Sequence, residues 1–140
     1  MNIFSSKSKT NLDSCHWDIK VLFNEVIKTY DCSILEGHRS QARQQDLFEA
    51  GYSKLQVSKH NKSPSNAVDV SPYPIPKNWG IDDDKERAKF YHFGGFVLGV
   101  AEVLKKQGKI NREITWGGDW NGNRDFNDQD FNDLIHFELK

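Results

Sequence analysis

The longest regular pattern in the sequence is a helical one in its second half. Three consecutive acids, Asp82 to Asp84, favour a helix start because negative side chains stabilise the positive end of the helix dipole. Gly108 is the expected stop. Between them, apolar side chains recur at helical spacing and form one stripe: Phe93, Phe96, Val97, Val100 and Leu104. Such a helix must bury its apolar face against other elements, which constrains the rest of the chain to supply them.

The other predicted elements are short. Two more helices are predicted from apolar spacing and end signals, Asp13–Tyr30 and Ser40–Ala50. Four strands are predicted, the second of them ended by prolines: Ser33–Glu36, Ala67–Val70, Ile114–Trp116 and Ile135–Leu139. Residues 1–10 are polar and are predicted to be a loose lead-in, and residues 52–66 and 117–132 to be loops. We therefore expect a single α+β domain over residues 1–140, with helices packed on a small, mainly antiparallel sheet.

The composition agrees with one folded domain and excludes some functions. Hydrophobic residues make up 36% of the 140 residues and aromatic residues 12%, which is enough for a packed core. The formal net charge of -1 gives no general reason to bind nucleic acid or an anionic membrane. No window approaches a membrane span, and the first residues lack an apolar run of signal-peptide length. We expect synthesis in the cytoplasm and no stable membrane association.

The two cysteines, Cys15 and Cys32, show neither zinc-type pair spacing nor a framework of several bridges. Two reduced, partly buried thiols are the preferred interpretation, and one disulfide is the alternative. A protein made in a reducing cytoplasm would not depend on such a bridge.

Three residues are candidate metal ligands. His60 stands in a Ser-Lys-His segment, Asp69 follows nine residues later on a predicted strand, and His136 lies in the last predicted strand. Two imidazoles and one carboxylate suit a catalytic zinc ion, which keeps a fourth position open. Spacing alone does not establish the site, because a single His or Asp is more often a hydrogen-bonded or turn residue. His-x8-Asp is also no general metal motif.

Three segments together resemble the D-alanyl-D-alanine peptidase and endolysin metallopeptidase family. Residues 58–70 resemble its Ser-x-His and Ala-x-Asp motif, with a longer loop that has Ser-Pro-Ser where glycine is common. Residues 133–139 resemble its acid-x-x-His motif and the short strand after it. Residues 37–40, Gly-His-Arg-Ser, resemble its Gly-x-Arg-Ser segment. Phage L-alanyl-D-glutamate endolysins are the most similar in size and in the segment Trp116–Trp120.

The resemblance implies a fold like that of hedgehog domains and D-Ala-D-Ala peptidases, and one catalytic zinc ion held by His60, Asp69 and His136. It also implies that Asp133 is the general base, a carboxylate that takes a proton from water and returns it to the leaving amine. Arg39 would polarise the scissile carbonyl and stabilise the oxyanion.

Two further residues are expected near the site. Glu138 faces the same way as His136 on a strand, so it could reach the site or orient a ligand from behind. It is the rival to Asp133 for the role of base. Ser58 is expected either to touch the substrate or to steady the loop. His16, His38 and His92 match no motif position, and Trp116 and Trp120 are expected in the core or the cleft wall.

The expected function is zinc-dependent hydrolysis of peptidoglycan stem peptides, at the L-alanyl-D-glutamate bond, by a phage endolysin during host cell lysis. A D-alanyl-D-alanine carboxypeptidase is the alternative enzyme. A non-catalytic zinc-bearing binding module is a third reading, and the presence of both Asp133 and Arg39 argues against it. The cell wall lies outside the membrane, so a separate membrane-permeabilising protein would be needed for release.

The loop from Asp119 to Asp125 presents oxygen-bearing side chains at alternate positions, as the start of a calcium loop does. Arg124 stands where an EF-hand needs glycine, and Asp130 replaces the final glutamate. A solvated turn is the preferred interpretation, with weak Ca²⁺ binding as the alternative.

Overall fold

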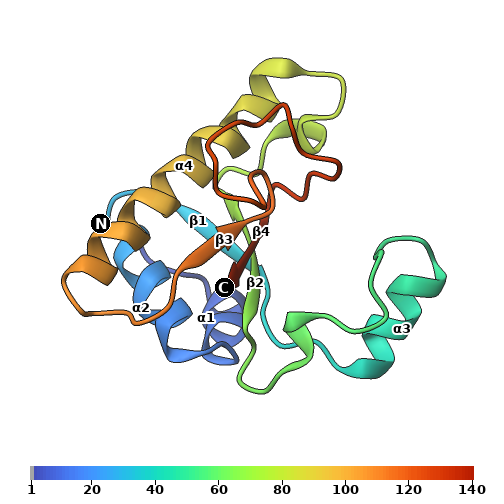
Figure 1. The fold of residues 1–140 in the computed structure, drawn as a ribbon, viewed down its shortest axis with the longest axis horizontal. Helices are drawn as coiled ribbons and strands as arrows, with labels where there is room; N and C mark the ends of the chain where they lie inside the picture. Colours follow the sequence, from blue (N-terminus) through green and yellow to red (C-terminus); the bar gives the residue numbers. More distant parts are fainter. Residues whose placement is uncertain (1) are drawn as a thin grey trace.

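Helices pack on a four-stranded antiparallel sheet, as expected. The computed structural model describes residues 2–140, and Met1 lies outside the described part. The helices are α1 Ser6–Asp13, α2 Trp17–Val26, α3 Gln41–Glu49 and α4 Asp84–Lys106, with two 3-10 turns, η1 Lys59–Asn61 and η2 Lys77–Gly80. The strands are β1 Cys32–Glu36, β2 Ala67–Pro72, β3 Ile114–Trp116 and β4 His136–Leu139. Their order is β1-β2-β4-β3, and each pairing is antiparallel (Figure 1).

The core lies between this sheet and two of the helices. Phe137 of β4 packs edge-on against Phe23 of α2 and Phe93 of α4, with ring centroids 5.5 and 6.1 Å apart. Gly94 of α4 lies so close to the indole of Trp116 that a Cβ atom there would collide with it. The long helix therefore reaches the sheet through aromatic side chains and through one glycine that permits close approach.

The opposite face of the sheet carries polar groups. Side chains alternate along a strand, so His136 and Glu138 point away from the face on which Phe137 is buried. Asp69 of β2 is the direct partner of His136 in the strand register. On its other side Asp69 pairs with Glu36 of β1, where an irregularity after Ile34 shifts the register. The sheet thus lines up two carboxylates and an imidazole in one row.

The predictions for the first thirty residues need correction. Residues 2–10 are no loose lead-in: α1 begins at Ser6, capped by the Ser5 hydroxyl, which accepts from the Ser8 amide at 3.1 Å. The predicted helix Asp13–Tyr30 is also too long, because α2 begins only at Trp17. The chain is turned at His16, whose N–H donates to the Ser65 carbonyl at 2.8 Å. A contact between segments so far apart in sequence leaves no local signal.

The remaining elements lie close to their predicted positions. Ser40 caps α3 and Asp83 caps α4, and glycines with positive φ follow both helices. β2 runs on to Pro72, two residues past the predicted end. Within β2, only residues 67–69 pair with β4. The missing N–H of Pro72 therefore removes no hydrogen bond to β4. Within the described residues, no helix is long and apolar enough to cross a membrane.

Both thiols are free and buried, in agreement with the reduced state. Burial raises the pKa of Cys15 to about 11 and that of Cys32 to about 12. The thiolate is the reactive form, so both side chains act as small apolar core groups.

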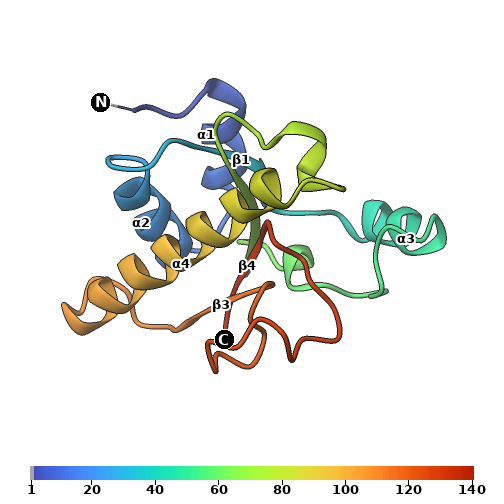
Figure 2. The ribbon, with the colours of Figure 1, turned by 90° about the horizontal axis from the view of Figure 1, so that it is seen from above.

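One part of the molecule stands apart. Residues 40–58, here called the arm, contain α3 and the turn after it. Figures 1 and 2 show α3 at the end of the molecule farthest from α1 and α2, with β2 and β4 between them.

Candidate metal centre

Three predicted ligands converge on the polar side of the sheet. His60 lies in η1, Asp69 in β2 and His136 at the start of β4, and all three are buried. One ligand atom from each lies within 4.8 Å of the other two. The Nε2 atom of His60 is 3.2 Å and the Nδ1 atom of His136 is 3.3 Å from the same carboxylate oxygen of Asp69. Residues far apart in sequence are therefore brought to one point.

The outer nitrogens of the two imidazoles fix which nitrogen faces inward as a ligand. The Nδ1 atom of His60 lies 2.7 Å from the Gly37 carbonyl, which can only accept, so Nδ1 carries the proton. The Nε2 atom of His136 lies 2.8 Å from Glu138 and donates to its carboxylate. In neutral imidazoles this leaves two lone pairs aimed at the Asp69 oxygen. The two lone pairs and the carboxylate oxygen repel one another unless a cation or an added proton lies between them. This donor set therefore fits a metal ion.

The charge distribution agrees with a cation site. Burial alone would raise the pKa of Asp69, but hydrogen bonds with His136 and His60 outweigh it and hold that pKa well below its ordinary value. Burial lowers the pKa of His136, yet its contacts with Asp69 and Glu138 raise it to about 9 overall. The surroundings of the two imidazoles therefore favour positive charge at this point, whether it comes from a proton or from a metal ion.

Arg39 borders the candidate metal ligands and is itself buried. Its Nε and Nη2 atoms donate to the two oxygens of Glu36 at 2.9 and 3.0 Å, and Nη2 lies 3.5 Å from the second oxygen of Asp69. Burial raises the pKa of Glu36, but hydrogen bonds from Arg39 and Arg43 lower it to about 2. The ionised Glu36 holds the Nε and Nη2 edge of the guanidinium beside Asp69.

The two candidate bases occupy different positions. Asp133 is half-buried in the loop before β4, and its carboxylate makes no hydrogen bond within residues 2–140. Burial and the negative charge of Asp69 raise its pKa, while His136, His60 and Arg39 lower it less. Glu138 is occupied on both oxygens, by His136 and by the Lys59 ammonium, each at 2.8 Å. Glu138 therefore contacts His136 from behind, and the Asp133 carboxylate has no protein partner among residues 2–140.

Ser58 steadies the segment that carries His60. Its hydroxyl accepts from the His60 amide at 3.1 Å, and its own amide donates to the Asn61 side chain at 2.7 Å. This reciprocal capping of η1 is one of the two roles expected for Ser58.

Residues 117–135, here called the β3–β4 loop, close the site from the other side. The ring of Trp120 lies 5.5 Å from that of His136 and stacks on Phe131 at 6.4 Å. The ammonium of Lys54, on the arm, lies 4.4 Å from the Phe131 ring centroid. Because a cation is attracted to an aromatic face, this contact joins the arm to the loop across the polar side of the sheet.

Comparison with protein families matches residues 1–140 to the phage L-alanyl-D-glutamate peptidases. The chain belongs to this peptidase family. Among solved structures, the crystal structure of the Serratia marcescens L-Ala D-Glu endopeptidase ChiX is similar, with a TM-score of 0.64 and 24% identity. The match covers 99% of this chain and 91% of the Serratia chain. Curated proteins give no match.

The remaining histidines of this peptidase lie outside the cluster. The His16 side chain caps α2 by accepting from the Asp18 amide at 3.0 Å, and His92 pairs with the Tyr30 hydroxyl at 2.7 Å. His38 is exposed. None of the three joins the metal ligands.

The acidic loop of the peptidase uses its oxygens to bind its own backbone. Asp119 accepts from the Arg124 amide at 2.8 Å, Asn121 from Asn123 at 3.2 Å and Asn123 from Asp125 at 2.8 Å. In the described part of the chain, the carboxylates of this loop form no second cluster with metal-ligand spacing. Calcium binding here stays a prediction.

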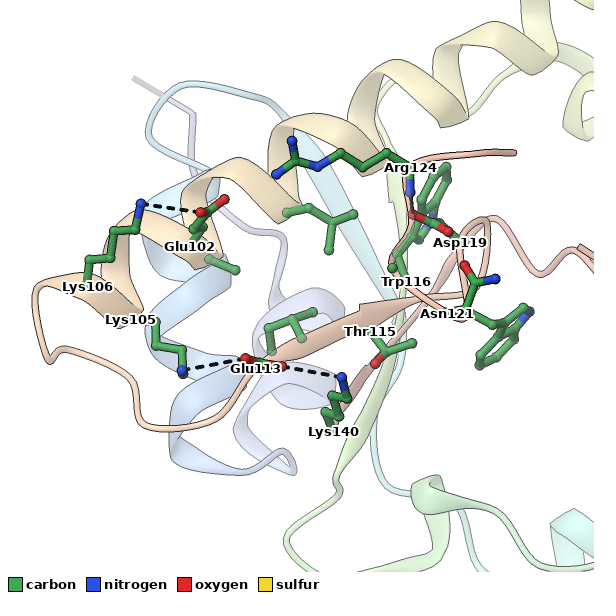
Figure 3. A pocket seen from close by; sticks show the side chains of 15 residues that line it. Glu102, Lys105, Lys106, Glu113, Thr115, Trp116, Asp119, Asn121, Arg124 and Lys140 are labelled. Atoms are coloured by element: carbon green, nitrogen blue, oxygen red, sulfur yellow. Dashed lines mark hydrogen bonds and ion pairs between the residues drawn. The ribbon is translucent and has the colours of Figure 1, made fainter. Parts of the chain in front are cut away.

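A separate cavity of about 540 Å³ lies between the C-terminal half of α4, β3 and the start of the β3–β4 loop (Figure 3). Lysines at its rim pair with acids: Lys106 with Glu102, and Lys105 and Lys140 with Glu113. The metal ligands do not line this cavity, so its volume says nothing about the peptidase site.

Proposed function

We propose that the chain is a zinc-dependent endopeptidase that cuts the L-alanyl-D-glutamate bond of peptidoglycan stem peptides. The observation that carries the proposal is the pair of inward imidazole lone pairs around Asp69, held in place by Gly37 and Glu138. Nitrogen and carboxylate ligands with a fourth position left open are typical of catalytic zinc. Membership of the phage L-alanyl-D-glutamate peptidase family supports the choice of bond.

The side chains around the cluster supply the rest of the reaction. A zinc ion held by His60, Asp69 and His136 would act as a Lewis acid on the carbonyl and on water. Asp133, with its raised pKa and free carboxylate, takes the proton of the attacking water and returns it to the amine of D-glutamate as the C–N bond breaks. Arg39 donates to the carbonyl oxygen as negative charge develops there.

The donors of Arg39 agree with that role. A guanidinium has five N–H groups. Glu36 accepts from Nε and Nη2, Asp69 faces Nη2, and Gln44 accepts from Nη1 at 2.8 Å. One N–H of Nη1 therefore has no acceptor within residues 2–140. A fixed donor without a partner in the protein is suited to an oxygen of the substrate.

We further propose that the enzyme acts as an endolysin, reaching the wall after a separate protein has opened the membrane. The match to the phage L-alanyl-D-glutamate peptidase family supports this role. A carboxypeptidase acting on D-alanyl-D-alanine and a zinc-bearing binding module are the other outcomes of the test.

The test is digestion of purified peptidoglycan with the zinc-loaded protein, followed by mass spectrometry of the muropeptides. New N-terminal D-glutamate is expected. Loss of terminal D-alanine alone would indicate the carboxypeptidase. An unchanged muropeptide pattern together with stoichiometric zinc would indicate the binding module. Removal of zinc with a chelator should abolish the cleavage, and readdition should restore it.

A further inference from the structure

Gln44 is the one buried side chain of α3, and it is fully buried although it is polar. The rest of the helix is exposed or half-exposed, and it lies at the far end of the molecule in both ribbon views (Figures 1 and 2). An amide in such a position must satisfy its hydrogen bonds inside the protein, because leaving them unmade is costly. The hydrogen-bond partners of Gln44 therefore show which parts of the protein it connects.

The partners of Gln44 lie in two different parts of the molecule. Its Oε1 atom accepts from Nη1 of Arg39 at 2.8 Å. Its Nε2 atom donates to the Ser53 hydroxyl at 2.8 Å and to the Leu55 carbonyl at 2.6 Å. The orientation of the amide is fixed by chemistry, since a guanidinium only donates and a carbonyl only accepts. Gln44 therefore links Arg39 to the turn of the arm.

Glu36 and Gln44 hold Arg39 from two directions. Glu36 binds the edge formed by Nε and Nη2, and Gln44 binds Nη1, the nitrogen that also carries the free N–H. Glu36 fixes that edge, and small tilts about it would still displace Nη1, which is not bound by Glu36. With Gln44 in place, the direction of the free N–H is set. A misplacement of about 1 Å at a reacting centre can cost on the order of 10²-fold in rate.

We infer that Gln44 is a positioning residue, which aims the free N–H of Arg39 and couples it to the turn at residues 53–55. This inference rests on the proposed function, in which Arg39 stabilises the developing oxyanion. Next to that turn the arm exposes three apolar side chains, at 84%, 57% and 69% of their full exposure: Tyr52, Leu55 and Val57.

A double-mutant cycle distinguishes positioning from a merely structural role. Gln44→Met keeps the length of the side chain and removes its hydrogen bonds, and Arg39→Ala removes the group that it is inferred to aim. Hydrolysis of a purified muropeptide is measured for the parent, both single variants and the double variant, with zinc content and thermal unfolding recorded for each. Gln45→Met is the matched control, because Gln45 lies on the same helix and, among residues 2–140, its side chain bonds only to Glu49.

Gln44→Met should lower kcat by roughly 10–100-fold, with a smaller change in KM and with zinc retained. In the Arg39→Ala background it should lower kcat no further, and Gln45→Met should match the parent. Equal losses in both backgrounds, additive within about twofold, would overturn the inference. If Gln44→Met does not fold, the same cycle is run with Gln44→Asn, whose shorter side chain withdraws the acceptor from Arg39, and additivity again overturns the inference. An inactive parent protein would instead overturn the proposed function and this inference with it.

Discussion

Replacing Glu138 with glutamine tests the support behind a metal ligand. The carboxylate accepts from Nε2 of His136, a side chain that is 9% exposed, and it pairs with the 44% exposed Lys59. The exposed pair contributes about 0–1 kcal/mol. The buried contact should contribute most of the effect. Glutamine keeps the size of Glu138, but the hydrogen bond that it accepts from His136 is no longer charge-assisted. Its NH2 group then faces the Lys59 ammonium, which is unfavourable because both groups only donate.

Loss of a partner behind a metal-binding histidine typically costs ~10–100-fold in metal affinity. We therefore expect the Kd for zinc of Glu138→Gln to rise by that factor, which equals about 1.4–2.7 kcal/mol. Competition with a chromogenic chelator at neutral pH measures the affinity, and muropeptide hydrolysis at saturating zinc measures kcat. Glu113→Gln is the matched control, since Glu113 is exposed and, in the described part of the chain, its carboxylate pairs with lysines away from the site.

Two results would refute this reasoning. Parental zinc affinity in Glu138→Gln would show that the contact with His136 does not support the ligand. Parental zinc content with a loss of kcat of about 10² or more would make Glu138 the general base in place of Asp133.

Three further predictions concern the proposed base, the His-Asp-His cluster after chelator treatment, and the core. Asp133→Asn should keep its zinc and lose about 10²–10⁴ in kcat, so nearly parental hydrolysis would exclude Asp133 as the base. In chelator-treated protein, His136 has its pKa raised from 6.5 to about 9, so its stabilisation is complete below pH 6.5 and is lost as the pH rises through 9. The difference is on the order of 3 kcal/mol, and urea unfolding at pH 6 and pH 9.5 should show lower stability at the higher pH. Gly94→Ala should destabilise the protein by ~1–3 kcal/mol in thermal unfolding, because its methyl group meets Trp116. Gly95→Ala, which meets open space, should be neutral or stabilising.

The sequence predicts the elements whose signals are local. The α4 helix has an apolar stripe, an acidic start and a glycine stop, and its observed ends lie within two residues of those signals. The break between α1 and α2 depends on a hydrogen bond from His16 to Ser65, which no spacing of apolar residues reveals. Local patterns therefore identify elements, while contacts between distant segments decide where some of them end.

The same distinction holds at the site. His60, Asp69 and His136 were recognised by motif, and the strand register explains why two of them meet. Gln44 was missed because it is one of several polar residues on a mostly exposed helix, and nothing in its spacing shows that it is buried. The proximity of Glu36 to Asp69 depends on an irregular register, which alternation along a strand does not predict. Motifs thus identify the candidate metal ligands, and the fold identifies the residues that contact them.

The way α3 is attached has a consequence for how the protein opens. A helix that buries one amide and no apolar side chain is fastened by a few hydrogen bonds, so it can detach without disturbing the aromatic core. Its backbone amides should exchange with deuterium through local opening, orders of magnitude faster than those of α4, whose apolar side chains are buried. Thermal unfolding is dominated by the core, so a variant with a detached helix could melt at the parental temperature. Hydrogen exchange in α3 would detect that loss directly.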